Sequence, residues 1–149
     1  MTTVKVAQAI RNAIEAELAS ARFYALLADS TDEPESRAFL ARLSAQELRH
    51  ASEIEQAGTE LVGSLPDYAD SDVAVVETLP AWRFVDDMTL GQALEVALAA
   101  EHSAALFYEA LANQLAEPVR SLFHEMASTE LDHANDLEAE RARVHPRRR

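Results

Sequence analysis

The chain lacks cysteine, contains only three glycines among its 149 residues, and has few aromatic residues. Without cysteine it can form no disulfide, no Fe–S cluster, no thiolate zinc site and no iron centre held by four cysteines. The scarcity of glycine, together with many Ala, Leu and Glu residues, favours helix throughout. The length is that of one domain with a sizeable core, so we predict a single all-α domain.

Positive charge is also scarce over most of the chain. The formal net charge is −13, and residues 141–149 hold five of the 13 basic residues and no acid. The first 140 residues therefore carry 8 basic against 26 acidic side chains, a charge of −18. Such a body disfavours nucleic acid as a partner and suits the attraction of cations. Because no signal-peptide core and no membrane-spanning apolar run is present, we expect a cytoplasmic protein with no membrane partner.

Hydrophobic periodicity divides the chain into four predicted helices. Pro34 and Pro118 suit the first position of the second and fourth helices, where a missing N–H costs nothing. Thr89 and Gln92 form a capping box at the start of the third helix, and Gly58 is expected to cap the end of the second. The expected helices span residues 3–29, 34–57, 89–114 and 118–143.

Residues 58–88 interrupt the helical pattern with two prolines and several aspartates. A segment this long without helix or strand is expected in a compact domain only if it crosses the molecule. One class of four-helix bundle contains such a crossover between two helical hairpins. We therefore predict a four-helix bundle over residues 1–143, with Trp82 and Phe84 holding the crossover against it, followed by a basic tail at residues 144–149.

Two short motifs carry the chemistry of this chain. Glu47-x-x-His50 lies on the second predicted helix, and Glu130-x-x-His133 lies on the fourth. Residues three apart share one face of a helix, so the Glu and His of each motif can reach the same metal ion. A single motif of this kind is a weak indication, and the rest of the chain has to support it.

Glu17 and Glu101 are single glutamates on the buried stripes of the first and third helices. With the two motifs they make six ionisable residues at positions where the helical pattern predicts an apolar side chain. Counted from the turns, all six lie near mid-helix and at one level. Buried carboxylates without partners are costly, and none of the four stripes contains Lys or Arg, so metal ions are the natural counter-charge.

The two halves of the chain also repeat. Ala16-Glu17 with Phe23-Tyr24 matches Ala100-Glu101 with Phe107-Tyr108, and each half supplies one Glu-x-x-His motif. On these residues the chain resembles the ferritin-like superfamily, in its rubrerythrin-like branch, over essentially residues 3–143. The resemblance implies a ferritin-like bundle of two helical hairpins around a two-metal site.

The resemblance also implies a role for each predicted ligand. Glu47 and Glu130 would bridge two irons, Glu17 with His50 would complete one iron, and Glu101 with His133 would complete the other. Carboxylate-rich sites with two imidazoles suit Fe(II), and Mn(II) fits at one or both positions. The expected cofactor is therefore two iron ions, with no Fe–S cluster and no haem, since no suitable haem-ligating methionine is evident.

We expect Glu17 or Glu101 to shift and open a coordination position during turnover. Tyr24 and Tyr108 lie two turns beyond these glutamates, where either can hydrogen-bond a ligand carboxylate from a neighbouring helix. These four are the candidate catalytic residues. The implied activity is a di-iron oxidoreductase that reduces H2O2 or O2, as a peroxide reductase or a ferroxidase, with an external electron donor.

Two features depart from the rubrerythrin pattern. Ala104 stands where these proteins usually carry a further Glu, and a chain without cysteine contains no rubredoxin domain, so electrons cannot be delivered within the chain. No fifth helix is expected that would build a cage, and we therefore expect a homodimer.

Two other functions are compatible with the same ligands. The first is a di-iron monooxygenase of an organic substrate, which would need a substrate channel and usually an apolar membrane-facing surface. The second is a non-catalytic iron-binding or delivery protein, docking to a larger compartment through its arginine-rich tail.

Overall fold

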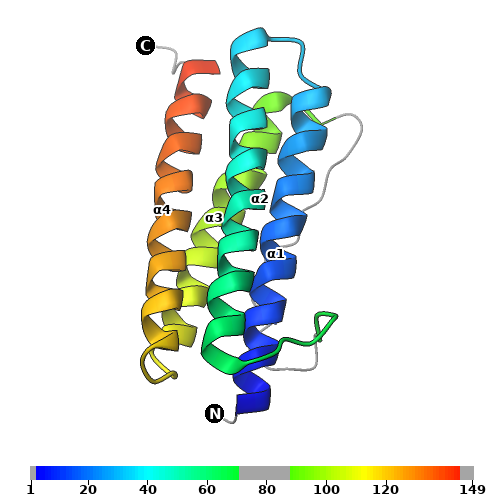
Figure 1. Ribbon diagram of the computed structural model, residues 1–149. Coiled ribbons are helices and arrows are strands. Elements are labelled where there is room, and N and C mark those ends of the chain that lie inside the picture. Colours follow the sequence, from blue (N-terminus) through cyan, green and yellow to red (C-terminus); the bar gives the residue numbers. More distant parts are fainter. Residues whose placement is uncertain (1–2, 71–87, 145–149) are drawn as a thin grey trace.

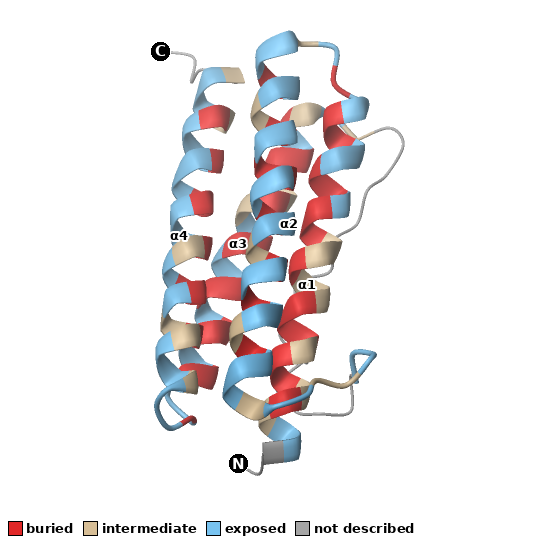
Figure 2. Ribbon diagram, viewed as in Figure 1, coloured by how far each residue is buried: buried red, intermediate tan, exposed pale blue. Residues whose placement is uncertain are grey.

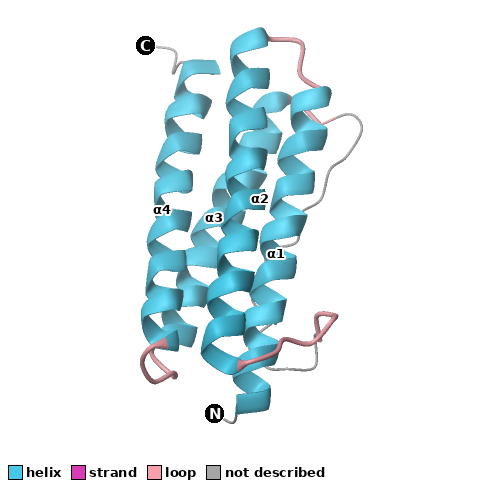
Figure 3. Cartoon of the chain, viewed as in Figure 1, coloured by secondary structure: helices cyan, strands magenta, loops and turns pink. Residues whose placement is uncertain are grey.

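The computed structural model describes residues 3–70 and 88–144, which fold into four long helices (Figure 1). Their bounds are α1 Thr3–Asp29, α2 Pro34–Val62, α3 Leu90–Ala112 and α4 Val119–Val144. No strand occurs in these two ranges (Figure 3). α1 pairs with α2 and α3 pairs with α4 as antiparallel hairpins, so the predicted all-α four-helix bundle is confirmed.

The connection between the hairpins runs from one end of the bundle to the other. In Figure 1, α2 ends beside the start of α4, whereas α3 begins at the opposite end. The first residues after α2 lie along α1: the Asn12 side chain exchanges hydrogen bonds of 2.8 and 3.2 Å with the backbone of Asp70. The predicted contacts of Trp82 and Phe84 and the tail beyond Val144 lie outside the described residues.

The prediction that Gly58 ends the second helix was wrong. α2 continues for another turn and ends at Val62, followed by Gly63 with a φ of 92°. Gly58 is needed for helix packing instead, because a Cβ at this position would lie only 2.6 Å from Cγ2 of Ile10. The glycine therefore lets α1 and α2 approach each other closely.

The ends of the second hairpin also differ slightly from the prediction. The capping box of Thr89 and Gln92 is present and starts α3 at Leu90. α3 ends at Ala112 rather than at residue 114, and α4 begins at Val119, one residue after Pro118. No described helix combines the length and the apolar composition needed to cross a membrane.

Two hydrophobic clusters fill the bundle, one towards each end. Buried residues lie along the inner faces of all four helices, and exposed residues cover the outside (Figure 2). One cluster contains Ile10, Ile14, Ile54, Phe123 and Met126, and the other contains Phe23, Leu27, Leu40, Leu94 and Leu137. Along each helix the six predicted metal ligands fall between these two sets, so a polar layer separates two apolar ones.

Candidate metal centre

The structure brings all six predicted metal ligands together in this polar layer. Each helix contributes from near its middle: one glutamate each from α1 and α3, and one Glu-x-x-His motif each from α2 and α4. All four glutamates are at most 2% exposed. His133 is buried, and the His50 side chain is 13% exposed. The residues concerned are Glu17, Glu47, His50, Glu101, Glu130 and His133.

These residues form two overlapping groups, each compact enough to hold one metal ion. Glu17, Glu47, His50 and Glu130 make the first group, and Glu47, Glu101, Glu130 and His133 make the second; within each group the ligand atoms lie within 4.8 Å of one another. Glu47 and Glu130 belong to both groups. This sharing is what a pair of bridged metal ions requires.

The histidines present Nδ1 to the carboxylates. His50 Nδ1 lies 3.3 Å from Glu17 Oε2 and 3.8 Å from Glu130 Oε1. His133 Nδ1 lies 2.6 Å from Glu47 Oε1 and 3.9 Å from Glu101 Oε2. Each imidazole therefore sits beside the single glutamate that the resemblance assigns to the same metal.

Two tyrosines fix the single glutamates across the α1–α3 interface. The Tyr24 hydroxyl donates a hydrogen bond of 2.6 Å to Glu101 Oε1, and the Tyr108 hydroxyl donates one of 3.1 Å to Glu17 Oε1. In both glutamates the tyrosine occupies Oε1 and leaves Oε2 buried without a hydrogen-bond partner. The expectation that these tyrosines bond carboxylates from a neighbouring helix is met in the structure, and their place is to position the carboxylates.

The centre contains an unusual concentration of unsatisfied polar atoms. Eight buried side-chain atoms in the described ranges lack a hydrogen-bond partner, and seven of them belong to the six clustered residues. Native proteins keep such atoms rare, because an unpaired buried polar group costs about 1–3 kcal/mol. Seven of them facing one another indicate a missing partner that accepts electron pairs from both carboxylates and imidazoles.

Burial and mutual contacts shift the pKa values of the four central glutamates. Burial, followed by the charge of Glu17, raises the pKa of Glu47 and of Glu130 well above the usual range of a carboxyl group. Burial also raises the pKa of Glu101. Burial would raise the pKa of Glu17 too, but the adjacent Glu47 and His50 side chains outweigh it and lower this pKa to about 2.

The raised pKa values of Glu47, Glu101 and Glu130 favour the neutral, protonated form of these carboxyl groups. The basic side chains that the described residues place within 4 Å of the four carboxylates are those of His50 and His133. Metal binding would require the ligands to lose their protons, and the shared carboxylates and imidazoles suit Fe(II) or Mn(II). The donor set fits a pair of such ions.

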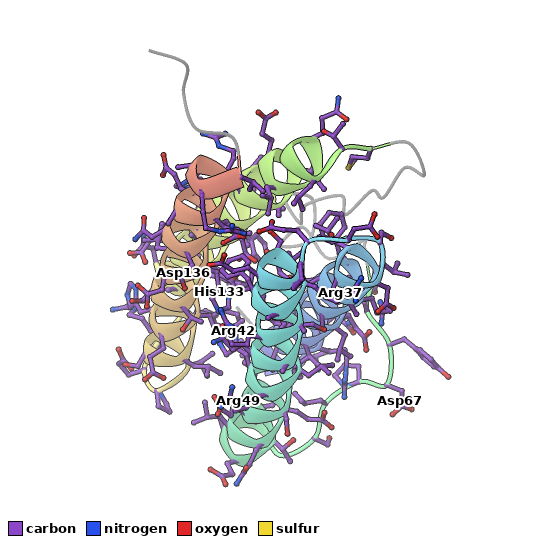
Figure 4. The ribbon with its side chains drawn as sticks, turned by 90° about the horizontal axis from the view of Figure 1, so that it is seen from above. Arg37, Arg42, Arg49, Asp67, His133 and Asp136 are labelled. Carbon is purple, nitrogen blue, oxygen red and sulfur yellow. The ribbon has the colours of Figure 1, made fainter. Side chains whose placement is uncertain are left out.

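A groove that the sequence did not predict gives access to this centre. It follows the interface between α2 and α4 as three adjoining hollows of about 380, 320 and 480 Å³. The middle hollow is lined by both His50 and His133. In the view along the bundle, His133 and Asp136 of α4 lie at this interface beside Arg42 of α2 (Figure 4).

α4 buries another glutamate, Glu140, whose surroundings differ from those of Glu130. Glu140 accepts hydrogen bonds from Ser36 Oγ at 2.9 Å and from Arg143 Nη2 at 2.5 Å. Arg143 also pairs with Glu33 at 2.8 Å, and this contact lowers the pKa of Glu33. The sequence offers one indication of this pairing, because Arg143 follows Glu140 by three residues and so shares its face of the helix.

Comparisons with known proteins agree with this geometry. The rubrerythrin family model matches residues 92–148, which contain Glu101 and the Glu130-x-x-His133 motif. No curated protein matches the chain. A hypothetical protein from Pyrococcus furiosus has a similar structure, with a TM-score of 0.69 and 20% sequence identity over 91% of this chain and 87% of its own.

At that identity the structural match shows the fold alone. The family match covers α3 and α4 and includes three of the six clustered residues. The described chain is a four-helix bundle with a candidate Glu/His metal centre, and its second helical hairpin matches the rubrerythrin family model.

Proposed function

We propose that the protein holds two iron ions in the central layer and reduces H2O2 or O2 with electrons from an external donor. The observation that carries this proposal is the set of seven buried, unpartnered donor atoms contributed by four helices. Glu47 and Glu130 would bridge the two ions, Glu17 with His50 would complete one position, and Glu101 with His133 the other. A pair of Fe(II) ions supplies two electrons, enough to reduce H2O2 to water or O2 to H2O2.

The side chains around the centre have distinct tasks in this reaction. Tyr24 and Tyr108 hold one oxygen of Glu101 and Glu17, so that only the other oxygen of each is free to bind. Oε2 of Glu17 or of Glu101 could then bind or release an iron ion while the tyrosine still holds Oε1 of the same carboxylate. The apolar clusters cover the layer on both sides, and the α2–α4 groove gives small molecules access to it.

Electrons have to come from another molecule. The chain has no cysteine and therefore no second redox centre built from thiolates. Ala104 is buried at the position where rubrerythrins usually carry a further glutamate, which leaves six ligands for the two ions. A centre with six ligands is compatible with both a peroxide reductase and a ferroxidase.

The test is stopped-flow absorbance on protein loaded anaerobically with Fe(II) and mixed in parallel with O2 or H2O2. Faster oxidation by H2O2 would identify a peroxide reductase, and faster oxidation by O2 a ferroxidase. Absence of reaction with either, in protein shown to hold two irons per chain, would contradict the oxidoreductase and leave an iron-binding or delivery protein.

A further inference from the structure

The α2–α4 groove has the same pseudo-two-fold symmetry as the ligands beneath it. Under the repeat that relates His50 to His133, side chains lining the hollow at one end correspond to side chains lining the hollow at the other. The corresponding pairs are Leu122 and Phe39, Met126 and Leu43, Glu53 and Asp136, Ala57 and Glu140, Thr129 and Gln46, and Glu125 and Arg42. Two of these six pairs differ in charge, so the two ends of the groove are not equivalent.

The end next to His50 is acidic. Its hollow of about 480 Å³ is lined by the exposed carboxylates Glu53 and Glu125, and its described lining includes no lysine or arginine. At the other end, Arg42 and Arg143 line the hollow together with Asp136 and Glu140, so two positive and two negative side chains balance there. A cleft lined by one sign of charge raises the local concentration of the opposite ion. Of the two end hollows, only the one next to His50 has a net negative lining.

The acidic end leads to donor atoms that lack a partner. Directly behind His50 lie Glu17 Oε2, at 3.3 Å from its Nδ1, and Glu130 Oε1, at 3.8 Å. Both oxygens are buried and make no hydrogen bond, and both residues are 2% exposed. The route from the surface thus passes two carboxylates and ends at buried oxygens that need a cation.

We propose that divalent cations reach the centre through the His50 end of the α2–α4 groove, with Glu53 and Glu125 as carboxylates that the ion passes. The proposal rests on the metal centre proposed above and adds a direction to its loading. The internal repeat supplies two similar hollows, and the exchange of Glu125 for Arg42 leaves one of them as the cation route.

The test measures metal loading and needs no turnover. Co(II) is mixed with the metal-free protein in a stopped-flow instrument, and its visible absorption reports binding. In the double variant Glu53→Gln/Glu125→Gln the association rate constant should fall about fivefold or more at low ionic strength, with two Co(II) still bound at equilibrium. The difference should shrink at high salt, because the effect is electrostatic.

The matched control changes the corresponding residues at the other end. Asp136→Asn/Arg42→Gln should load within about twofold of the unmodified protein, since that end is not on the proposed route. Equal rates for the unmodified protein and Glu53→Gln/Glu125→Gln, or equal slowing in both double variants, would overturn the route while two Co(II) per chain still support the centre. Failure of the unmodified protein to bind Co(II) would instead overturn the metal centre itself.

Discussion

The bundle buries glutamates in two places, and it compensates for them in two ways. Near the end of α4, Glu140 is paired with Arg143 and Ser36, so its charge is balanced within the chain. At mid-height, four glutamates gather with two histidines, and no stripe residue is a lysine or an arginine. The comparison distinguishes a structural ion pair from a candidate binding site: the chain itself supplies the cation for Glu140, and its described residues supply no lysine or arginine for the four central glutamates.

The sharpest test of this comparison removes one glutamate from each place. Glu47→Gln should reduce binding from two metal ions per chain to at most one, because Glu47 belongs to both ligand groups. Glu140→Gln should still bind two, because its partners come from the chain. Metal analysis of reloaded, desalted protein measures both numbers. Two metals bound by Glu47→Gln would contradict its bridging role.

The second test uses pH on the metal-free protein. The raised pKa values of Glu47, Glu101 and Glu130 mean that the folded chain holds more protons than the unfolded chain above about pH 4.5. Its stability must then fall as pH rises, since deprotonation favours the unfolded state. We expect the melting temperature to drop by at least about 5 °C between pH 5 and pH 8.

Other groups in the centre shape this pH profile. The contact with Glu17 outweighs burial and raises the pKa of His50, so the stabilisation from His50 is present below about pH 6.5 and is also lost as pH rises. The low pKa of Glu17 acts in the opposite direction, but only as pH falls from about 4.5 towards 2. Bound metal should reverse the trend, because the ligands bind it deprotonated. A flat metal-free profile would contradict the assigned pKa shifts.

A smaller effect is expected from the tyrosines. Tyr24→Phe removes the hydrogen bond that fixes Glu101, and Tyr108→Phe removes the one that fixes Glu17. Loss of such a supporting contact typically weakens metal binding about tenfold. Calorimetric titration with Mn(II) should show one weakened site in each variant and two bound ions in both. Unchanged affinities would mean that the carboxylates are held in place without the tyrosines.

The smallest effect should come from the structural ion pair. The Arg143 side chain is 33% exposed, so its pairing with Glu140 should contribute only modestly to stability. Arg143→Gln should therefore lower the melting temperature by about 2–4 °C without changing metal stoichiometry. Thermal unfolding followed by circular dichroism measures the shift. Restoration of stability in the double variant Glu140→Gln/Arg143→Gln would confirm that the cost arises from the unpaired carboxylate.

The sequence by itself determined the four helices, the two hairpins and the six clustered residues. Helical periodicity and the two Glu-x-x-His motifs depend only on local spacing, so they can be read without the fold. The helix limits depend on more than local spacing. The sequence predicts that Gly58 caps the second helix, whereas the structure shows that it permits the close contact with Ile10. A glycine's role depends on what packs against it, and local sequence does not contain that information.

Only the tertiary structure decided which buried charge has a partner and which way the centre opens. The pairing of Glu140 with Ser36 joins α4 to α2, and the bonds from Tyr24 and Tyr108 join α1 to α3. The charge difference between the two ends of the α2–α4 groove likewise arises from residues that meet only in the folded bundle. The residues that form these contacts lie far apart along the chain. The energy of each contact depends on distance and burial, which only the fold determines.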